Sequence, residues 1–383
     1  MTLRVLIVTG TRADFGLWQP ILREASRRGP EISAALLVTA MHLDPRFGGT
    51  ISEVRSSGWP IAAEVPCTPE GDALSDMSIA LGVAISRMTP VLDAQRPDWL
   101  VLLGDRGEQA AAALVALHLE IPVAHIHGGE VSRGAVDDTL RDVISRVAHL
   151  HLAANEGAAA RLRAMGEESW RIHVVGAPGL DLLREEAQTD IAELRRRYGL
   201  GEGGYIIVLH HPETRGTPDP LSDLTEVLRA VEDIHVPVLA IFPNADAGGR
   251  AMAELLARTP GVHAVPSLPR GEFAPLLANA SVLVGNSSSG LIEAPLLGVP
   301  AVNVGERQAG RMRGDNVLDV PADASSIADA IRRAMNDAFR RNLSRVSPYG
   351  DGYAAPRIVD LLLSTRRTPE LLLKHVGTDV LAN

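Results

Sequence analysis

Five of the proton-carrying side chains between positions 105 and 138 lie at or just beyond the ends of expected strands. They are Asp105, His127, Glu130, Asp137 and Asp138. Acid–base catalysis needs carboxylate and imidazole groups of this kind within reach of one substrate. Helix capping is the alternative for the aspartates, with a helix beginning near position 107 for the first and a helix ending near position 149 for the other two. For Asp138 we prefer the capping interpretation.

The segment "HIHGGE" places two histidines on alternate residues of an expected strand, so both can point to one side, as metal ligands do. No third ligand follows at a recognisable spacing. Cys67 is the single cysteine, which excludes an internal disulfide and a cysteine metal cluster. We therefore predict a protein without a metal or an organic cofactor.

A second set of polar residues fits an anion. The segment "GNSSSGLIEAPLLG" follows an apolar run and is expected to open a helix, so the backbone N–H groups and hydroxyls of Ser287, Ser288 and Ser289 would face a diphosphate. Simple N-capping by serine is the alternative. Glu293 lies further into that helix, where it is either within reach of a ribose or a solvated surface residue.

Charge partners for such an anion occur elsewhere in the chain. Arg12 lies in "VTGTRADFG", where a dinucleotide-binding loop would carry glycines, and Arg307 lies in "GERQAGR". His211, in "LHHPET", can donate a hydrogen bond to phosphate. The alternatives are an ordinary surface arginine and a structural histidine.

These residues follow short apolar runs that alternate with helical patterns, which predicts parallel sheets covered on both faces. The expected strands are residues 4–9, 34–39, 99–104, 122–126, 171–176, 205–209, 236–242, 262–265, 281–285 and 301–304. We predict an α/β protein of two doubly wound Rossmann-like domains with a cleft between them. The first covers residues 1–181 together with C-terminal helices within 356–383, and the second covers residues 182–355. Ligands bind at the carboxyl ends of strands in such sheets, which is where these polar residues lie.

The amino-acid composition limits which binding partners and which cellular compartment are expected. The net charge is −10 and the isoelectric point is near 5.7, so nucleic acid is not an expected partner. No stretch approaches about 18 uninterrupted apolar residues, so we expect no membrane span. The single lysine, Lys374, lies near the C-terminus, which removes Schiff-base and P-loop chemistry from the core. We expect a cytoplasmic protein that forms a homo-oligomer, a dimer or a tetramer.

Taken together, the motifs resemble the UDP-N-acetylglucosamine 2-epimerase family, in its hydrolysing branch from nonulosonic (sialic-type) acid biosynthesis. The resemblance covers most of the chain with matching order and spacing. Besides the segments above it includes "LVTAMHLDPRFGGT", "LGDRGE", "GAVDDTLRDVISRVAHLHL", "VVGAPGLD", "FPNADAGGRAM" and "PYGDGYAAPRI".

The resemblance implies a GT-B-like architecture with the nucleotide mainly on the second domain and the sugar facing the first. It implies loss of the C2 proton, elimination of UDP to a 2-acetamidoglycal, and addition of water to release a sugar inverted at C2. Asp105 and Asp137 become the expected catalytic carboxylates, with His127 and Glu130 beside them. The expected UDP ligands are Arg12, His211, Ser287, Ser288, Glu293 and Arg307. We add Asp14, Asn244 and Ser289, which follow the same strand ends.

Two positions depart from the family pattern. His127 stands where the common form "HIEGGE" has an acid, and Asp142 stands where many members carry histidine. The family leaves open whether the sugar is N-acetylglucosamine or a 2,4-diacetamido-trideoxy relative. A GT-B glycosyltransferase, which would share the diphosphate site, and a sensor that binds the nucleotide sugar without turnover are the competing interpretations.

Overall fold

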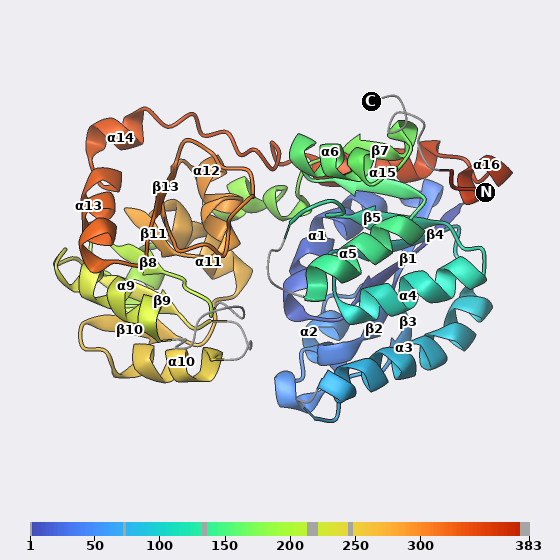
Figure 1. Ribbon diagram of the computed structural model, residues 1–383, viewed down its shortest axis with the longest axis horizontal. Helices are drawn as coiled ribbons and strands as arrows, with labels where there is room; N and C mark the ends of the chain where they lie inside the picture. The colour runs from blue at the N-terminus through green and yellow to red at the C-terminus, as the bar shows by residue number, and fades with distance from the viewer. Residues whose placement is uncertain (1, 72–73, 132–135, 213–220, 244–247, 376–383) are drawn as a thin grey trace. The chain divides into compact units, whose positions relative to one another are not determined.

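The computed structural model describes residues 2–71, 74–131, 136–212, 221–243 and 248–375 (Figure 1). Contacts divide the chain into two compact units. Unit 1 contains the described residues up to Asp181 and those from Tyr353 onward, and unit 2 runs from Leu182 to Gly352. Each unit is described by itself below.

Unit 1 is built on a parallel sheet of seven strands in the order β3-β2-β1-β4-β5-β6-β7. The strands are β1 (Leu3–Thr9), β2 (Ile32–Thr39), β3 (Ile61–Val65), β4 (Trp99–Leu103), β5 (Val123–Ile126), β6 (Leu150–Ala153) and β7 (Ile172–Val174). Successive residues of β1 point to opposite faces: Val5 and Ile7 enter one hydrophobic core, and Leu6 and Val8 enter the other. Both faces are therefore covered, as the near-continuous apolar runs predict.

Helices α3, α4 and α5 lie side by side on one face of this sheet, and α1 and α15 pack on the other (Figure 1). The helices of unit 1 are α1 (Arg12–Arg27), α2 (Ile51–Ser56), α3 (Leu74–Gln95), α4 (Gly107–His118), α5 (Val136–Val147), α6 (Glu156–Ala164), α15 (Ala354–Ser364) and α16 (Pro369–Leu372). Asp181 accepts a hydrogen bond from Ala354 N at 2.9 Å, at the start of α15, and Trp99 Nε1 donates to the carbonyl of Leu362 at 3.2 Å. The C-terminal helices thus complete the core of unit 1.

One described helix has the length and apolar composition to cross a membrane, the part of α3 from Ser75 to Gln95, of which 22% is buried. Its buried residues Ala84, Met88 and Leu92 belong to the core beneath α3 and α4. A core helix passes the same test of length and composition, so this one helix is weak evidence for a membrane span.

Unit 2 repeats the design with six parallel strands in the order β10-β9-β8-β11-β12-β13. The strands are β8 (Ile206–Val208), β9 (Val238–Ile241), β10 (Val262–Val265), β11 (Val282–Gly285), β12 (Ala301–Val304) and β13 (Val317–Val320). The helices are α7 (Leu183–Glu186), α8 (Ala192–Arg197), α9 (Ser222–Glu232), α10 (Gly249–Arg258), α11 (Arg270–Ala278), α12 (Glu293–Leu297), α13 (Ala324–Ala334) and α14 (Asp337–Arg341). Helices α9, α10 and α13 cover one core, and α8, α11 and α12 cover the other.

In each sheet the strand order reverses beside the first strand, between β1 and β4 in unit 1 and between β8 and β11 in unit 2. Such switch points are where doubly wound sheets bind ligands. The predicted fold class, two doubly wound α/β domains, is confirmed. Strands β3, β6 and β13 were not among the predicted strands.

Candidate active site

Asp14 organises the loop between β1 and α1. Its carboxylate accepts hydrogen bonds from the N–H groups of Gly10 and Thr11, at 2.9 Å each, and from the hydroxyls of Thr9 and Thr11. The Thr11 hydroxyl in turn accepts from Asp14 N, which completes a capping box. Burial raises the pKa of Asp14 to about 6, against the opposing effect of the Gly10 hydrogen bond. The carboxylate of Asp14 therefore fixes the shape of its own loop, and its assignment to UDP stays a prediction.

Arg12 is the first residue of α1 and pairs with Glu53 of α2 at 2.9 Å. The two side chains are 47% and 44% exposed. An exposed ion pair contributes only about 0–1 kcal/mol, so Glu53 restrains the guanidinium weakly. Arg12 is therefore able to exchange this partner for an anionic ligand.

Asp105 follows β4 and is held by Arg141 of α5. The Nη2 group of Arg141 donates to the Asp105 carboxylate, and its Nη1 group donates to the carbonyl of Glu130 at 2.8 Å. Arg141 is 4% exposed, and its buried charge is balanced by the carboxylates of Asp105 and Asp138. The N-cap residue of α4 is Arg106, without a side-chain cap. The capping alternative for Asp105 is therefore excluded.

Asp137 and Asp138 both lie in the first turn of α5, where carboxylates favour the helix N-terminus. Asp138 pairs with Arg141 at 3.5 Å and with Arg161 at 3.4 Å. Asp137 is exposed. Its charge, after the larger effect of Glu108, helps to raise the pKa of Arg106, which follows β4. Because Asp105 follows β4 and α5 follows the neighbouring parallel strand β5, Asp105 and Asp137 lie at the same carboxyl edge of the unit 1 sheet.

His127 and Glu130 form a hydrogen-bonded pair. The distance from His127 Nδ1 to Glu130 Oε1 is 2.5 Å, and the two side chains are 14% and 8% exposed. His127 has a φ of +62°, which is uncommon for a residue other than glycine. Gly129 also has a positive φ, and a Cβ there would lie 2.3 Å from the carbonyl oxygen of Ala158, so the turn requires glycine. A carboxylate that orients an imidazole is the arrangement of a general base and its positioning group.

His125, the other histidine of this segment, is buried and has both ring nitrogens in contact with protein. Nε2 lies 2.7 Å from the carbonyl oxygen of Gly104, and Nδ1 lies 3.1 Å from the hydroxyl of Ser145. Burial lowers its pKa to about 3, so the ring is neutral. Within the described ranges, no group of three or more His, Cys, Asp or Glu side chains is arranged to hold a metal ion.

In unit 2 the polar residues meet around Asn286, directly after β11. Its side chain accepts from His211 N at 2.7 Å and donates to the His211 carbonyl at 2.9 Å. Its backbone carbonyl accepts from Arg307 Nη1 at 3.2 Å and from Gln308 Nε2 at 2.8 Å. Burial, and next the charge of Arg307, lower the pKa of His211 to about 3, so its imidazole is neutral. Two of the predicted UDP ligands, His211 and Arg307, are thus joined by a residue that was not predicted.

Ser288 and Ser289 lie in a 3₁₀ turn, Ser288–Gly290, with Ser287 as its N-cap, and the α-helix begins only at Glu293. The prediction that a helix opens at the serines is wrong in this detail. An α-helix from Ser288 would place Pro295 in its interior, where proline removes a hydrogen bond and clashes with the preceding turn. The hydroxyl of Ser287 accepts from Ser289 N at 3.3 Å, so the capping alternative holds for this residue. Glu293 is half-buried.

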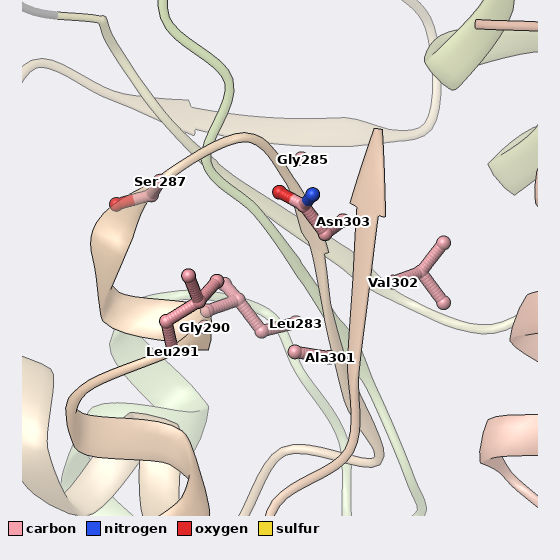
Figure 2. A pocket seen from close by; sticks show the side chains of 8 residues that line it. All are labelled: Leu283, Gly285, Ser287, Gly290, Leu291, Ala301, Val302 and Asn303. Atoms are coloured by element: carbon pink, nitrogen blue, oxygen red, sulfur yellow. The ribbon is translucent and has the colours of Figure 1, made fainter. Parts of the chain in front are cut away.

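A small cavity lies beside this turn (Figure 2). Its walls are formed by Leu283, Gly285, Ser287, Gly290, Leu291, Ala301, Val302 and Asn303. The cavity offers about 10 Å³ to the centre of a water molecule, roughly what one water needs. The cavity is therefore too small for a nucleotide.

Asn244 lies outside the described residues. The sequence analysis predicted no role for three residues of these hydrogen-bond networks, Arg141, Asn286 and Gln308. A signal existed for two of them: Arg141 follows Asp138 at the i,i+3 spacing of a helical ion pair, and Asn286 directly follows the last residue of β11.

The two units, each with polar side chains at the switch point of a doubly wound parallel sheet, define an α/β protein of the GT-B-like class. The model of the family described as UDP-N-acetylglucosamine 2-epimerase matches residues 24–363. The UDP-N,N'-diacetylbacillosamine 2-epimerase (hydrolyzing) of Legionella pneumophila is 36% identical over 378 residues, covering 98% of this chain and 99% of that protein. The UDP-N-acetylglucosamine 2-epimerase of Neisseria meningitidis is 35% identical over 333 residues, covering 86% and 87%.

Among solved structures, the Neisseria meningitidis UDP-GlcNAc 2-epimerase bound to UDP-GlcNAc aligns with a TM-score of 0.79 and 21% identity, covering 95% of this chain and 100% of that one. That likeness shows the fold. The chain belongs to the UDP-N-acetylglucosamine 2-epimerase family, as a UDP-sugar 2-epimerase. The family that the motifs predicted is confirmed.

Proposed function

We propose that this protein converts UDP-N-acetylglucosamine to N-acetylmannosamine and UDP through a 2-acetamidoglycal. The observation that carries the proposal is the grouping at the carboxyl edge of the unit 1 sheet. There an imidazole–carboxylate pair, His127 with Glu130, accompanies Asp105 held by Arg141. A relative named as a hydrolysing 2-epimerase, similar over 98% of the chain, supports the hydrolytic outcome.

The chemistry explains why several proton carriers are needed. The C2 proton has no adjacent carbonyl and is barely acidic, so it leaves as the C1–O bond to UDP breaks and the C1–C2 double bond forms. Water then adds its hydroxyl to C1, and a proton adds to C2 from the face opposite to the one that lost it. We assign these transfers at C2 to Asp105 and Asp137, with His127 and Glu130 as the pair that handles the attacking water.

Stabilisation of the departing UDP must supply much of the rate. We assign its diphosphate to Arg12, His211, Arg307 and the serine turn, and its ribose to Glu293. Removing one preorganised donor from such a group typically lowers the rate by about 100- to 1,000-fold. Ser287, Ser288 and Ser289 remain the proposed donors of the turn.

A second candidate substrate is UDP-N,N'-diacetylbacillosamine. The Legionella pneumophila relative, 36% identical over 98% of this chain, carries that substrate in its name, whereas the Neisseria meningitidis relative, 35% identical over 86%, is named for UDP-N-acetylglucosamine. Both sugars undergo the same elimination and addition. We further propose a cytoplasmic role in which the free sugar supplies nonulosonic acid biosynthesis.

The test is incubation of the protein with each nucleotide sugar in D₂O, followed by NMR of the products. We expect UDP and a free sugar inverted and deuterated at C2, from one of the two substrates. A lasting UDP-N-acetylmannosamine product would identify a non-hydrolysing epimerase. Free sugar with its original C2 proton, or UDP-sugar binding without turnover, would refute the proposal in favour of glycosyl transfer to water or of a sensor.

The matched control is Asp105→Asn. It keeps the size of the side chain and removes its acid–base function, and Asp105 is not among the residues assigned to UDP. This variant should bind UDP as the wild type does and incorporate deuterium at least about 100-fold more slowly.

A further inference from the structure

We infer that Asn286 is a positioning residue that fixes the His211 segment and Arg307 in one arrangement for the diphosphate. Asn286 is fully buried and contacts both groups. The inference rests on the proposed function, because His211 and Arg307 are its proposed UDP ligands. Asn286 itself would not contact UDP; it would act by positioning His211 and Arg307.

The side chain of Asn286 continues the sheet where the backbone ladder stops. The hydrogen bond from Leu209 N to the Val284 carbonyl, at 2.9 Å, joins β8 and β11 at their carboxyl ends. Two residues further along each segment, Asn286 pairs with both the N–H and the carbonyl of His211. An amide side chain carries an acceptor and a donor in fixed geometry, as a peptide group does. The two-point contact therefore holds the His211 backbone in both position and orientation.

Gly285 explains why the amide meets this segment. It has a φ of +136°, and a Cβ there would lie 2.2 Å from the Leu209 carbonyl oxygen. The end of β11 and the segment after β8 approach too closely for any side chain at position 285, and the positive φ of this residue also favours glycine. The next residue, Asn286, is thereby brought against His211.

The backbone carbonyl of Asn286 makes the second link. It accepts from Arg307 and Gln308, in the segment after β12, and Gln308 is 2% exposed. One buried residue therefore connects the segments that follow β8, β11 and β12. A mispositioned Asn286 shifts Arg307 as well as His211.

Truncation to alanine removes both side-chain contacts and leaves the His211 N–H and carbonyl without this partner. Losing a buried hydrogen bond of this kind corresponds to about a tenfold change in an equilibrium constant. We expect Asn286→Ala to weaken UDP binding by about tenfold or more. Uridine, which lacks the diphosphate, should lose less than about threefold.

The experiment is titration calorimetry with UDP and with uridine on the wild type, Asn286→Ala, Arg307→Ala and the double variant. If Asn286 acts partly through Arg307, the double variant loses less affinity than the product of the two single losses. The control is Asn155→Ala, because Asn155 is also buried but caps α6 in unit 1, where its side chain accepts from Ala158 N at 2.9 Å. This control should bind UDP within about threefold of the wild type.

Folded Asn286→Ala with wild-type UDP affinity would overturn the inference, as would equal losses for UDP and uridine or independent losses in the double variant. Should Asn286→Ala fail to fold, Asn286→Asp serves instead. It keeps the acceptor for His211 N but turns a carboxylate oxygen toward the His211 carbonyl, so it too should weaken UDP binding. A wild-type protein that does not bind UDP would refute the proposed function itself, a result distinct from these.

Discussion

Glu167 provides a quantitative test of how unit 1 is held together. It is buried and receives His151 Nε2 at 2.9 Å, Lys374 Nζ at 2.6 Å and Arg146 Nη1 at 3.1 Å. Burial alone would raise the pKa of Glu167. The hydrogen bond from His151, and then the charge of Lys374, outweigh burial and lower the pKa from 4.5 to about 2. The perturbation we consider is Glu167→Gln.

The magnitude follows from this pKa difference. A fall from 4.5 to about 2 corresponds to about 3 kcal/mol of stability at pH 7. Because the folded-state pKa is the lower one, this stability is fully present above about pH 4.5 and is lost as the pH falls toward 2. At pH 3 about 1 kcal/mol of it remains. Glu167→Gln should therefore lower the free energy of unfolding by about 3 kcal/mol at pH 7 and by about 1 kcal/mol at pH 3.

Urea unfolding of the wild type and the variant at the two pH values measures this difference. The control is Glu156→Gln, since Glu156 is 72% exposed and pairs with Arg163 at 3.8 Å, and we expect less than about 0.5 kcal/mol there. UDP affinity should stay unchanged, because the residues assigned to UDP around Asn286 lie in unit 2. A loss for Glu167→Gln that is equal at pH 7 and pH 3 would refute the electrostatic argument and leave packing as the cause.

Two further predictions concern the chemistry of unit 1. Asp137→Asn should lower kcat, measured by steady-state kinetics, by about 100-fold or more. Its UDP affinity, measured by calorimetry, should stay within about twofold of the wild type, and an equal loss of UDP affinity would make Asp137 a nucleotide ligand instead. His127→Gln should also lower kcat by about 100-fold in the same kinetic assay, since glutamine can still bond to Glu130 but has no ring nitrogen to accept a proton. A fully active variant would show that His127 is a packed strand-end residue.

Most of the sheet could be predicted because buried parallel strands are continuous apolar runs. The missed strands lack that pattern. β6 has the sequence LHLA, with a histidine that pairs with Glu167, and β3 has the sequence IAAEV, with two alanines and an exposed glutamate. β13 is only partly buried. Their pairing with neighbouring strands, rather than their own composition, makes them strands.

The sequence could predict candidate site residues only from their position directly after a strand. Position does not say what a side chain faces. The capping box "TRAD" was a readable signal that Asp14 serves its own loop. The contacts of Arg141 and Asn286 join residues 36 and 75 positions apart, and only the folded sheet brings these partners together.

Both units solve one physical problem in the same way. At a switch point two neighbouring parallel strands diverge, so the last N–H and C=O groups of each strand no longer hydrogen-bond to the other strand. These groups are buried, and a buried backbone group without a hydrogen bond destabilises the fold. In unit 1, fully buried Gln109 donates to the Val8 carbonyl of β1 at 3.2 Å and accepts from Leu103 N of β4 at 3.4 Å. In unit 2, Asn286 joins the segment after β11 to the segment after β8. An amide suits both places because it replaces the missing peptide group without adding charge. The charged side chains nearby have other partners: Arg106 pairs with Glu108 at 2.7 Å, and Arg307 donates to the Asn286 carbonyl at 3.2 Å.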